Sequence, residues 1–110
     1  MKVAVIGSRS IVKVDLSKYL LGVDEIVSGG AKGVDSCASA YAKLNGLKLT
    51  LFLPDYKTYK KGAPIVRNKK IVDYADKVFA FWDGESKGTL SVINYAKKIC
   101  KPCEIILIKN

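Results

Sequence analysis

Short apolar runs alternate along the chain with segments in which apolar residues recur every three or four positions. The short runs have the length and the β-branched or aromatic content of strands. They lie at 2–6, 25–28, 47–53, 77–82 and 104–108. The periodic segments have the spacing of helices packed on a sheet. They follow Asp15, extend from Val34 to Ala42, follow Pro64 and extend from Val92 to Ile99.

The resulting order, βαβαβαβαβ, determines the predicted fold class. Strands that are almost wholly apolar, such as 77–82, are typical of a parallel sheet covered on both faces. Right-handed crossovers then give a doubly wound, Rossmann-like α/β fold with a mainly parallel five-stranded sheet and helices on both faces. The 110 residues predict one domain, 1–110, without repeats. A polar loop is expected through Tyr56, Tyr59 and Lys61.

Composition excludes several protein classes. No apolar stretch approaches the roughly 20 residues that span a bilayer, and no secretory signal is recognisable, so we expect a cytoplasmic protein with no membrane partner. Histidine is absent, which excludes Ser-His-Asp and Cys-His catalysis and His-ligated metal sites. We expect neither a metal nor a cofactor.

The chain has three cysteines, an odd number that favours a reducing compartment over a disulfide framework. Cys37 is expected in the core. Cys100 and Cys103 have the spacing of a redox or zinc pair, but three cysteines without histidine do not complete four zinc ligands. The pair follows a predicted helix and precedes a strand, the reverse of a thioredoxin motif, so we interpret it as an element junction and leave a redox role open.

The net charge is +9, and most of the excess lies in the second half of the chain. Residues 56–110 contain 12 basic and 5 acidic side chains, a net +7, against 7 and 5 in residues 1–55, a net +2. Such a surface attracts phosphate-bearing partners, or it keeps the protein in solution without a specific partner. Charge alone does not separate these readings.

Glycine-rich and polar segments follow three of the predicted strands, where doubly wound folds bind ligands. Glycines there allow close approach of the backbone, and helix N-termini direct N–H groups at anions. Arginine adds a planar fork suited to phosphate. The candidate ligand-binding residues are Gly7, Ser8, Arg9, Ser28, Gly29, Gly30, Ala31, Lys32, Gly33, Asp35, Arg67, Asn68, Trp82, Asp83, Gly84, Lys87, Gly88 and Thr89.

Each of these features also has a purely structural reading. The glycines after 25–28 are compatible with a tight strand-to-helix turn, and Asp35 with capping of the helix. Trp82 either stacks on a base or completes its strand. Arg67 is equally compatible with a solvated surface.

Taken together, these segments resemble the SLOG superfamily of Rossmann-like domains. That superfamily joins DNA-processing protein A and the Lonely Guy phosphoribohydrolases, and it includes small stand-alone members. The segment Ser28 to Asp35 is the most specific part of the resemblance. The resemblance implies that the glycine loops bind a nucleotide or a nucleotide-derived ligand, which some relatives sense as a signal.

Three functions remain open. The first is a sensor or sequestering protein that binds a nucleotide-derived small molecule. The second is an N-glycosidic-bond hydrolase, for which Asp83 is the candidate catalytic residue; Val92, however, stands where aligning Gly88-Thr89 on the Lonely Guy loop places the catalytic glutamate. The third is binding of single-stranded DNA, as the resemblance to DNA-processing protein A implies, with Trp82, Tyr56 and Tyr59 as stacking platforms beside Lys57, Lys60 and Lys61. A homodimer is compatible with all three.

Overall fold

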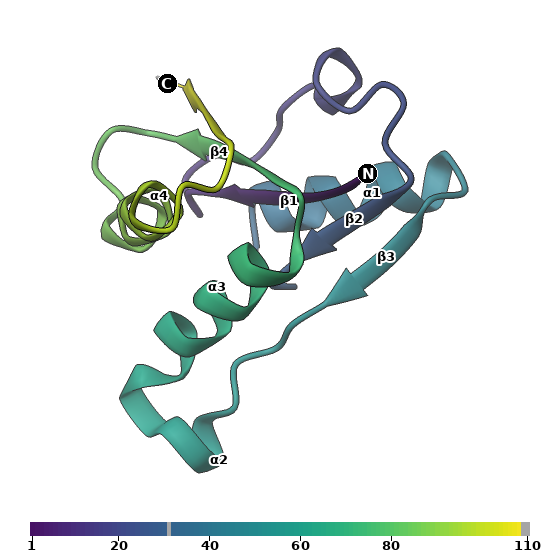
Figure 1. Ribbon diagram of the computed structural model, residues 1–110. Helices are drawn as coiled ribbons and strands as arrows, with labels where there is room; N and C mark the ends of the chain where they lie inside the picture. Colours follow the sequence, from purple (N-terminus) through teal and green to yellow (C-terminus); the bar gives the residue numbers. More distant parts are fainter. Residues whose placement is uncertain (31, 109–110) are drawn as a thin grey trace.

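The computed structural model describes residues 1–30 and 32–108 and contains a five-stranded, all-parallel sheet in the order β3-β2-β1-β4-β5 (Figure 1). The central strand β1 pairs with β2 on one side and with β4 on the other. The chain therefore reverses its direction of winding at β1, as the predicted doubly wound fold requires. The strands are Lys2–Gly7 (β1), Glu25–Ser28 (β2), Lys48–Leu51 (β3), Lys77–Trp82 (β4) and Cys103–Leu107 (β5).

Helices cover both faces of the sheet, because successive side chains of β1 alternate between the two. Val3 and Val5 pack with α1 in one core, while Ala4 and Ile6 pack with α3 and α4 in the other. A short 3-10 helix, η1, adds to the α1 side. The helical segments are Leu16–Lys18 (η1), Val34–Leu44 (α1), Tyr56–Tyr59 (α2), Lys60–Gly62 (η2), Ala63–Tyr74 (α3) and Lys87–Lys98 (α4).

Local signals fix most of these boundaries. Asp15 caps η1 by accepting a hydrogen bond from the Ser17 N–H, as expected, and Pro64 stands in the first turn of α3. Asn45 is the C-cap of α1, three residues beyond the periodic segment that ends at Ala42. The fold class predicted from the apolar pattern is thus confirmed.

The segment 55–62 differs from the prediction. It was expected to be a polar loop, but it forms α2 and η2, whose side chains are all outside the core (Figure 1). Asp55 nucleates α2 by accepting a hydrogen bond from the Thr58 N–H. A four-residue helix without a buried face has no apolar periodicity, so the pattern did not reveal it.

Three strands also have different limits: β1 extends one residue further than predicted, to Gly7, and the remaining two are β3 and β5. β3 covers only 48–51 of the predicted 47–53, although Phe52 still donates its N–H to the Ser28 carbonyl oxygen. β5 begins one residue earlier than predicted and ends at Leu107. Both are edge strands, whose single hydrogen-bonded neighbour decides where pairing stops.

The cysteines occupy junctions and partly buried positions rather than a shared site. Cys37 is half-buried against the α1 core, Cys100 lies between α4 and β5, and Cys103 is the first residue of β5. Burial raises the pKa of the Cys103 thiol, which disfavours a reactive thiolate. Within residues 1–30 and 32–108 no three potential metal ligands come together, and none of the helices there has the length and apolar character needed to cross a bilayer.

Candidate functional site

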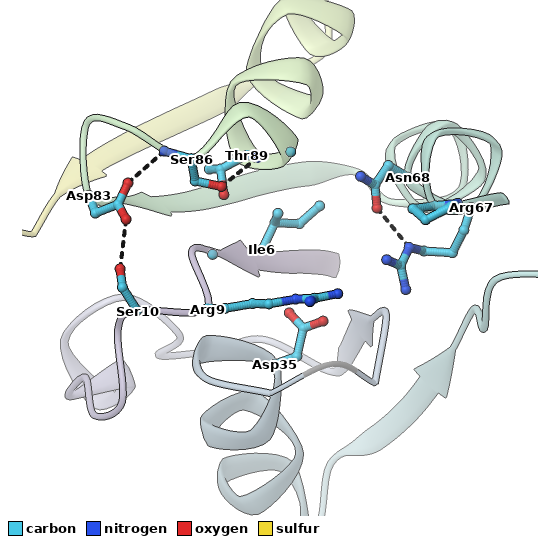
Figure 2. A pocket seen from close by; sticks show the side chains of 12 residues that line it. Ile6, Arg9, Ser10, Asp35, Arg67, Asn68, Asp83, Ser86 and Thr89 are labelled. Atoms are coloured by element: carbon cyan, nitrogen blue, oxygen red, sulfur yellow. Dashed lines mark hydrogen bonds between the residues drawn. The ribbon is translucent and has the colours of Figure 1, made fainter. Parts of the chain in front are cut away.

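A polar cavity of about 400 Å³ opens at the carboxyl end of β1, between α1, α3 and α4 (Figure 2). This is the point at which the strand order switches direction, where open α/β sheets bind ligands. The volume lies within the usual range for small-molecule sites. Its lining consists of Ile6, Gly7, Arg9, Ser10, Asp35, Pro64, Arg67, Asn68, Asp83, Ser86, Gly88 and Thr89.

Two glycines bring α1 close to the end of β1. A Cβ on Gly7 would overlap Val34 in the first turn of α1, with Cβ, Cγ1 and Cγ2 of that side chain all closer than 3.0 Å. Gly33, the residue before α1, has φ +78°, and a Cβ there would lie 2.9 Å from the Ile11 carbonyl oxygen. Any side chain at either position would push the first turn of α1, which carries Asp35, away from the cavity.

Arg67 joins α3 to the loop that follows β2. Its Nη1 donates to the Gly29 carbonyl oxygen at 2.9 Å, and its Nε donates to Asn68 Oδ1 at 2.7 Å. The guanidinium passes so close to Gly29 that a Cβ there would lie 2.5 Å from Nη1 and 3.2 Å from Asp35 Oδ2. Gly29 is therefore needed for this approach, and the Arg67 guanidinium is held beside the buried Asp35 carboxylate at the wall of the cavity.

Arg9 is the second cationic side chain of the cavity, and it is held less firmly than Arg67. It is exposed, and within the described part of the chain its guanidinium has no hydrogen bond or ion pair. In Figure 2 the side chain extends from the loop after β1 in the direction of Arg67. Five N–H donors are thus available to a ligand from this residue alone.

Asp83 closes the opposite end of the cavity through three hydrogen bonds. Its Oδ1 accepts the backbone N–H groups of Glu85 and Ser86, both at 2.8 Å, and its Oδ2 accepts the Ser10 hydroxyl at 2.6 Å. These bonds, led by that of Ser10, hold the pKa of the Asp83 carboxyl far below its usual range. Asp83 is therefore ionised at neutral pH and is not a proton donor.

The start of α4 is capped in part from within the chain. The Ser86 hydroxyl caps the helix by accepting the Thr89 N–H at 3.3 Å, and Asp83 accepts the N–H groups of Glu85 and Ser86, which precede the first helical residue, Lys87. Buried below them, the Ser8 hydroxyl lies 3.4 Å from the Thr89 hydroxyl and accepts the Asp83 N–H. At α1, by contrast, Gly33 provides no side-chain cap.

The cavity gathers only part of the predicted set. Gly7, Arg9, Asp35, Arg67, Asn68, Asp83, Gly88 and Thr89 line it. The residues that do not line it are Ser8, Ser28, Gly29, Gly30, Lys32, Gly33, Trp82, Gly84 and Lys87, while Ala31 lies outside the described residues. Several of these residues support the lining without contacting the cavity. The Trp82 indole N–H, for example, donates to the Ser86 carbonyl oxygen and so holds the loop before α4.

Four lining residues were not predicted: Ile6, Ser10, Pro64 and Ser86. Ser86 could have been recognised from the sequence, because serine directly before a helix is a typical N-cap. Its hydroxyl accepts the N–H of the residue three positions later, Thr89. Ser10 has no comparable signal. Its role depends on a loop that brings it to Asp83, 73 residues further along the chain.

Comparison with solved structures gives one match that covers nearly all of the chain. DNA processing protein A from Helicobacter pylori, determined in work on its single-stranded DNA binding mode, superposes with a TM-score of 0.70 at 24% sequence identity. The match covers 96% of this chain and 64% of that chain. This chain has the same Rossmann-like fold. The fold implied by the glycine-rich motifs is thus confirmed, over somewhat less than two thirds of the length of DNA processing protein A.

Comparison at the level of sequence adds nothing to this, because neither a family model nor a curated protein matches the chain. The likeness of fold locates the cavity but does not identify its ligand.

Proposed function

We propose that the chain binds a nucleotide or nucleotide-derived ligand in the cavity at the end of β1, as a sensor or sequestering protein. The observation that carries the proposal is the pair of arginines at the switch point of the sheet. Arg67 is fixed by two hydrogen bonds and Arg9 is unpaired within the described residues. A fixed and a free guanidinium suit the bidentate recognition of a phosphate group.

The carboxylates support the same reading. Asp35 is buried at the Arg67 side, and Asp83 lies at the other end of the cavity (Figure 2). Carboxylates at these positions suit the hydroxyl groups of a ribose, since an ionised carboxylate only accepts hydrogen bonds. A sugar phosphate therefore matches the lining better than a purely apolar ligand does.

The hydrolase alternative has less support. The lowered pKa of Asp83 disfavours a general-acid role and is compatible with an electrostatic or nucleophilic one. Val92, which stands in place of the Lonely Guy glutamate, is buried in the α3–α4 core and does not line the cavity. Within the described lining, no glutamate therefore stands at the position that the Lonely Guy loop would require.

The test compares AMP with adenosine by calorimetry on the purified protein, after any co-purified ligand has been released and identified by mass spectrometry. We expect AMP to bind more tightly than adenosine. Arg67→Gln should weaken AMP binding by at least about tenfold, the usual effect of removing a charge-assisted hydrogen bond. Lys97→Gln on the exposed last turn of α4 removes the same charge and is the matched control. Equal affinity for AMP and adenosine, or equal losses in both variants, would refute the proposal.

Single-stranded DNA is the second candidate, and two observations favour it. The structure similar in fold belongs to a protein with a single-stranded DNA binding mode. In addition, α2 and η2 contain exposed Tyr56 and Tyr59 together with exposed Lys57, Lys60 and Lys61. Aromatic rings and lysines on one surface are what stacking and phosphate contacts require.

Oligonucleotide length separates the two candidates. A cavity for one nucleotide should bind dTMP and a 12-mer of dT with similar affinity. A strand-binding surface should bind the 12-mer far more tightly, and this affinity should fall steeply with salt, with a slope of about −0.7 per phosphate contacted. A steep slope that is lost in Lys57→Gln/Lys60→Gln/Lys61→Gln would establish the second candidate.

A further inference from the structure

The two ends of the cavity differ in charge. Arg67 and Asn68 lie at the α3 end, and Asp83 and Ser10 lie at the end formed by the loop after β1 and the start of α4 (Figure 2). Arg9 extends toward the first end, where it adds a positive charge to the adjacent Arg67 and Asp35. The α3 end therefore carries a positive excess, while Asp83 makes the other end negative.

The loop that leads into α4 holds a carboxylate of its own. Asp83 Oδ1 accepts the N–H groups of Glu85 and Ser86, which precede the first residue of α4, Lys87. The carboxylate stays ionised at neutral pH, as its hydrogen bonds require. A ligand phosphate beside Asp83 would meet a like charge.

The hydrogen bonds of Asp83 leave limited room for a ligand. A carboxylate has about four lone-pair directions, and three are taken by Glu85, Ser86 and Ser10. The remaining one belongs to Oδ2, which accepts only from the Ser10 hydroxyl. Asp83 is thus prepared to accept one hydrogen bond from a hydroxyl or amino group of the ligand.

We propose that Asp83 is the specificity-determining residue of the site: it selects ligands with a phosphate at one end and an uncharged hydrogen-bond donor at the other, and it rejects ligands with phosphates at both ends. The inference rests on the proposed nucleotide binding, which it makes more specific. The ligand class that follows is a monophosphorylated nucleoside with a free hydroxyl or amino group directed at Asp83.

The experiment compares the affinities of AMP and adenosine 3′,5′-bisphosphate in four proteins. In the unmodified chain AMP should bind more tightly than the bisphosphate by about tenfold, because like charges near a protein surface repel by this order. Asp83→Asn, which removes the charge and keeps one acceptor oxygen, should abolish that preference. Glu85→Gln removes the same charge from an exposed side chain outside the cavity and should retain it.

Ser10→Ala tests whether the preference for AMP depends on the charge of Asp83 or on the rigidity of its loop. It removes the 2.6 Å hydrogen bond but leaves the carboxylate, so the preference for AMP should persist. If Asp83→Asn does not fold, as its melting curve would show, the salt dependence of the unmodified chain gives the answer. The preference should shrink as KCl is raised from about 0.05 to 0.5 M, because salt screens partly exposed charges.

Each outcome is decisive. No binding of AMP would overturn the proposed function and the inference with it. Binding of AMP without a preference over the bisphosphate would leave the proposed function intact and overturn the inference. A preference that Ser10→Ala or Glu85→Gln removes as completely as Asp83→Asn does, or one that is independent of salt, would also overturn it.

Discussion

Gly7→Ala should destabilise the protein strongly although it adds a single methyl group. The new Cβ would overlap three side-chain atoms of Val34, which is itself fully buried between β1 and α1. Insertion of atoms into a packed core costs about 1–3 kcal/mol. We expect the upper value, about 3 kcal/mol, because one of the overlapped atoms is the Cβ of Val34, which no rotamer change can move.

Urea denaturation followed by the fluorescence of Trp82, the one tryptophan of the chain, measures this effect. With a slope of about 1–3 kcal/mol per molar urea, the midpoint should fall by about 1–3 M at an unchanged slope. Gly62→Ala is the matched control, because a Cβ there meets nothing within 4 Å and φ is −82°. Its midpoint should change little, since the gain in chain rigidity and the altered helix start are each below about 1 kcal/mol.

A second variant tests the cause. Adding Val34→Ala to Gly7→Ala removes Cγ1 and Cγ2 but leaves the Val34 Cβ, so it should not restore stability. Full recovery in the double variant, or a midpoint for Gly7→Ala equal to that of Gly62→Ala, would refute the claim that backbone proximity of β1 and α1 requires glycine at this position.

Three further predictions concern the hydrogen bonds of two carboxylates and one residue with an unfavourable backbone conformation. Asp83→Asn should be less stable than the unmodified chain at pH 7, and the difference should shrink progressively as the pH of the melting experiments falls below about 4. The reason is that a lowered carboxyl pKa stabilises the folded state fully above the ordinary aspartate pKa of about 3.9, and this stabilisation is lost as the pH falls from there toward the lower pKa of the folded chain. Tyr74→Phe removes a 2.6 Å hydrogen bond to the Glu25 carboxylate, which should cost about 1.5–3 kcal/mol in urea denaturation and raise the pKa of Glu25 followed by NMR. Cys100→Gly should raise the melting temperature, because Cys100 has φ +59° after the end of α4, where a non-glycine residue costs about 1–2 kcal/mol.

The apolar pattern predicted the architecture well where burial is complete. β4 is apolar from Val78 to Trp82 and lies second from the edge of the sheet, covered on both faces, and its limits agree with the prediction. α2 was missed because none of its side chains is buried, and the edge strands β3 and β5 were misplaced by one or two residues at their ends. An element with a buried face has a periodic pattern of apolar residues, whereas a fully exposed element has no such pattern.

The cavity was predicted in position but not in detail. Residues such as Arg9 and Asp35 follow strand ends, where the fold rule places ligands. The roles of the glycines could not be read from their loop, because they depend on contacts across the fold: Gly29 makes room for Arg67 of α3, and Gly30, at φ +71°, lies against Leu53. Gly30→Asp, which the motif suggests as a probe of phosphate binding, would therefore strain the backbone outside the cavity.

The two arginines of the cavity differ in how firmly the folded chain holds them, and this difference affects the thermodynamics of ligand binding. Arg67 has already lost its rotational freedom in the folded chain, through its bonds to Gly29 and Asn68. Arg9 has not, so a ligand that engages both must order one side chain only, at an entropic cost of about 2 kcal/mol. The measured entropy of binding should therefore respond to substitution of Arg9 much more than to substitution of Arg67, whose loss should be seen mainly in the enthalpy.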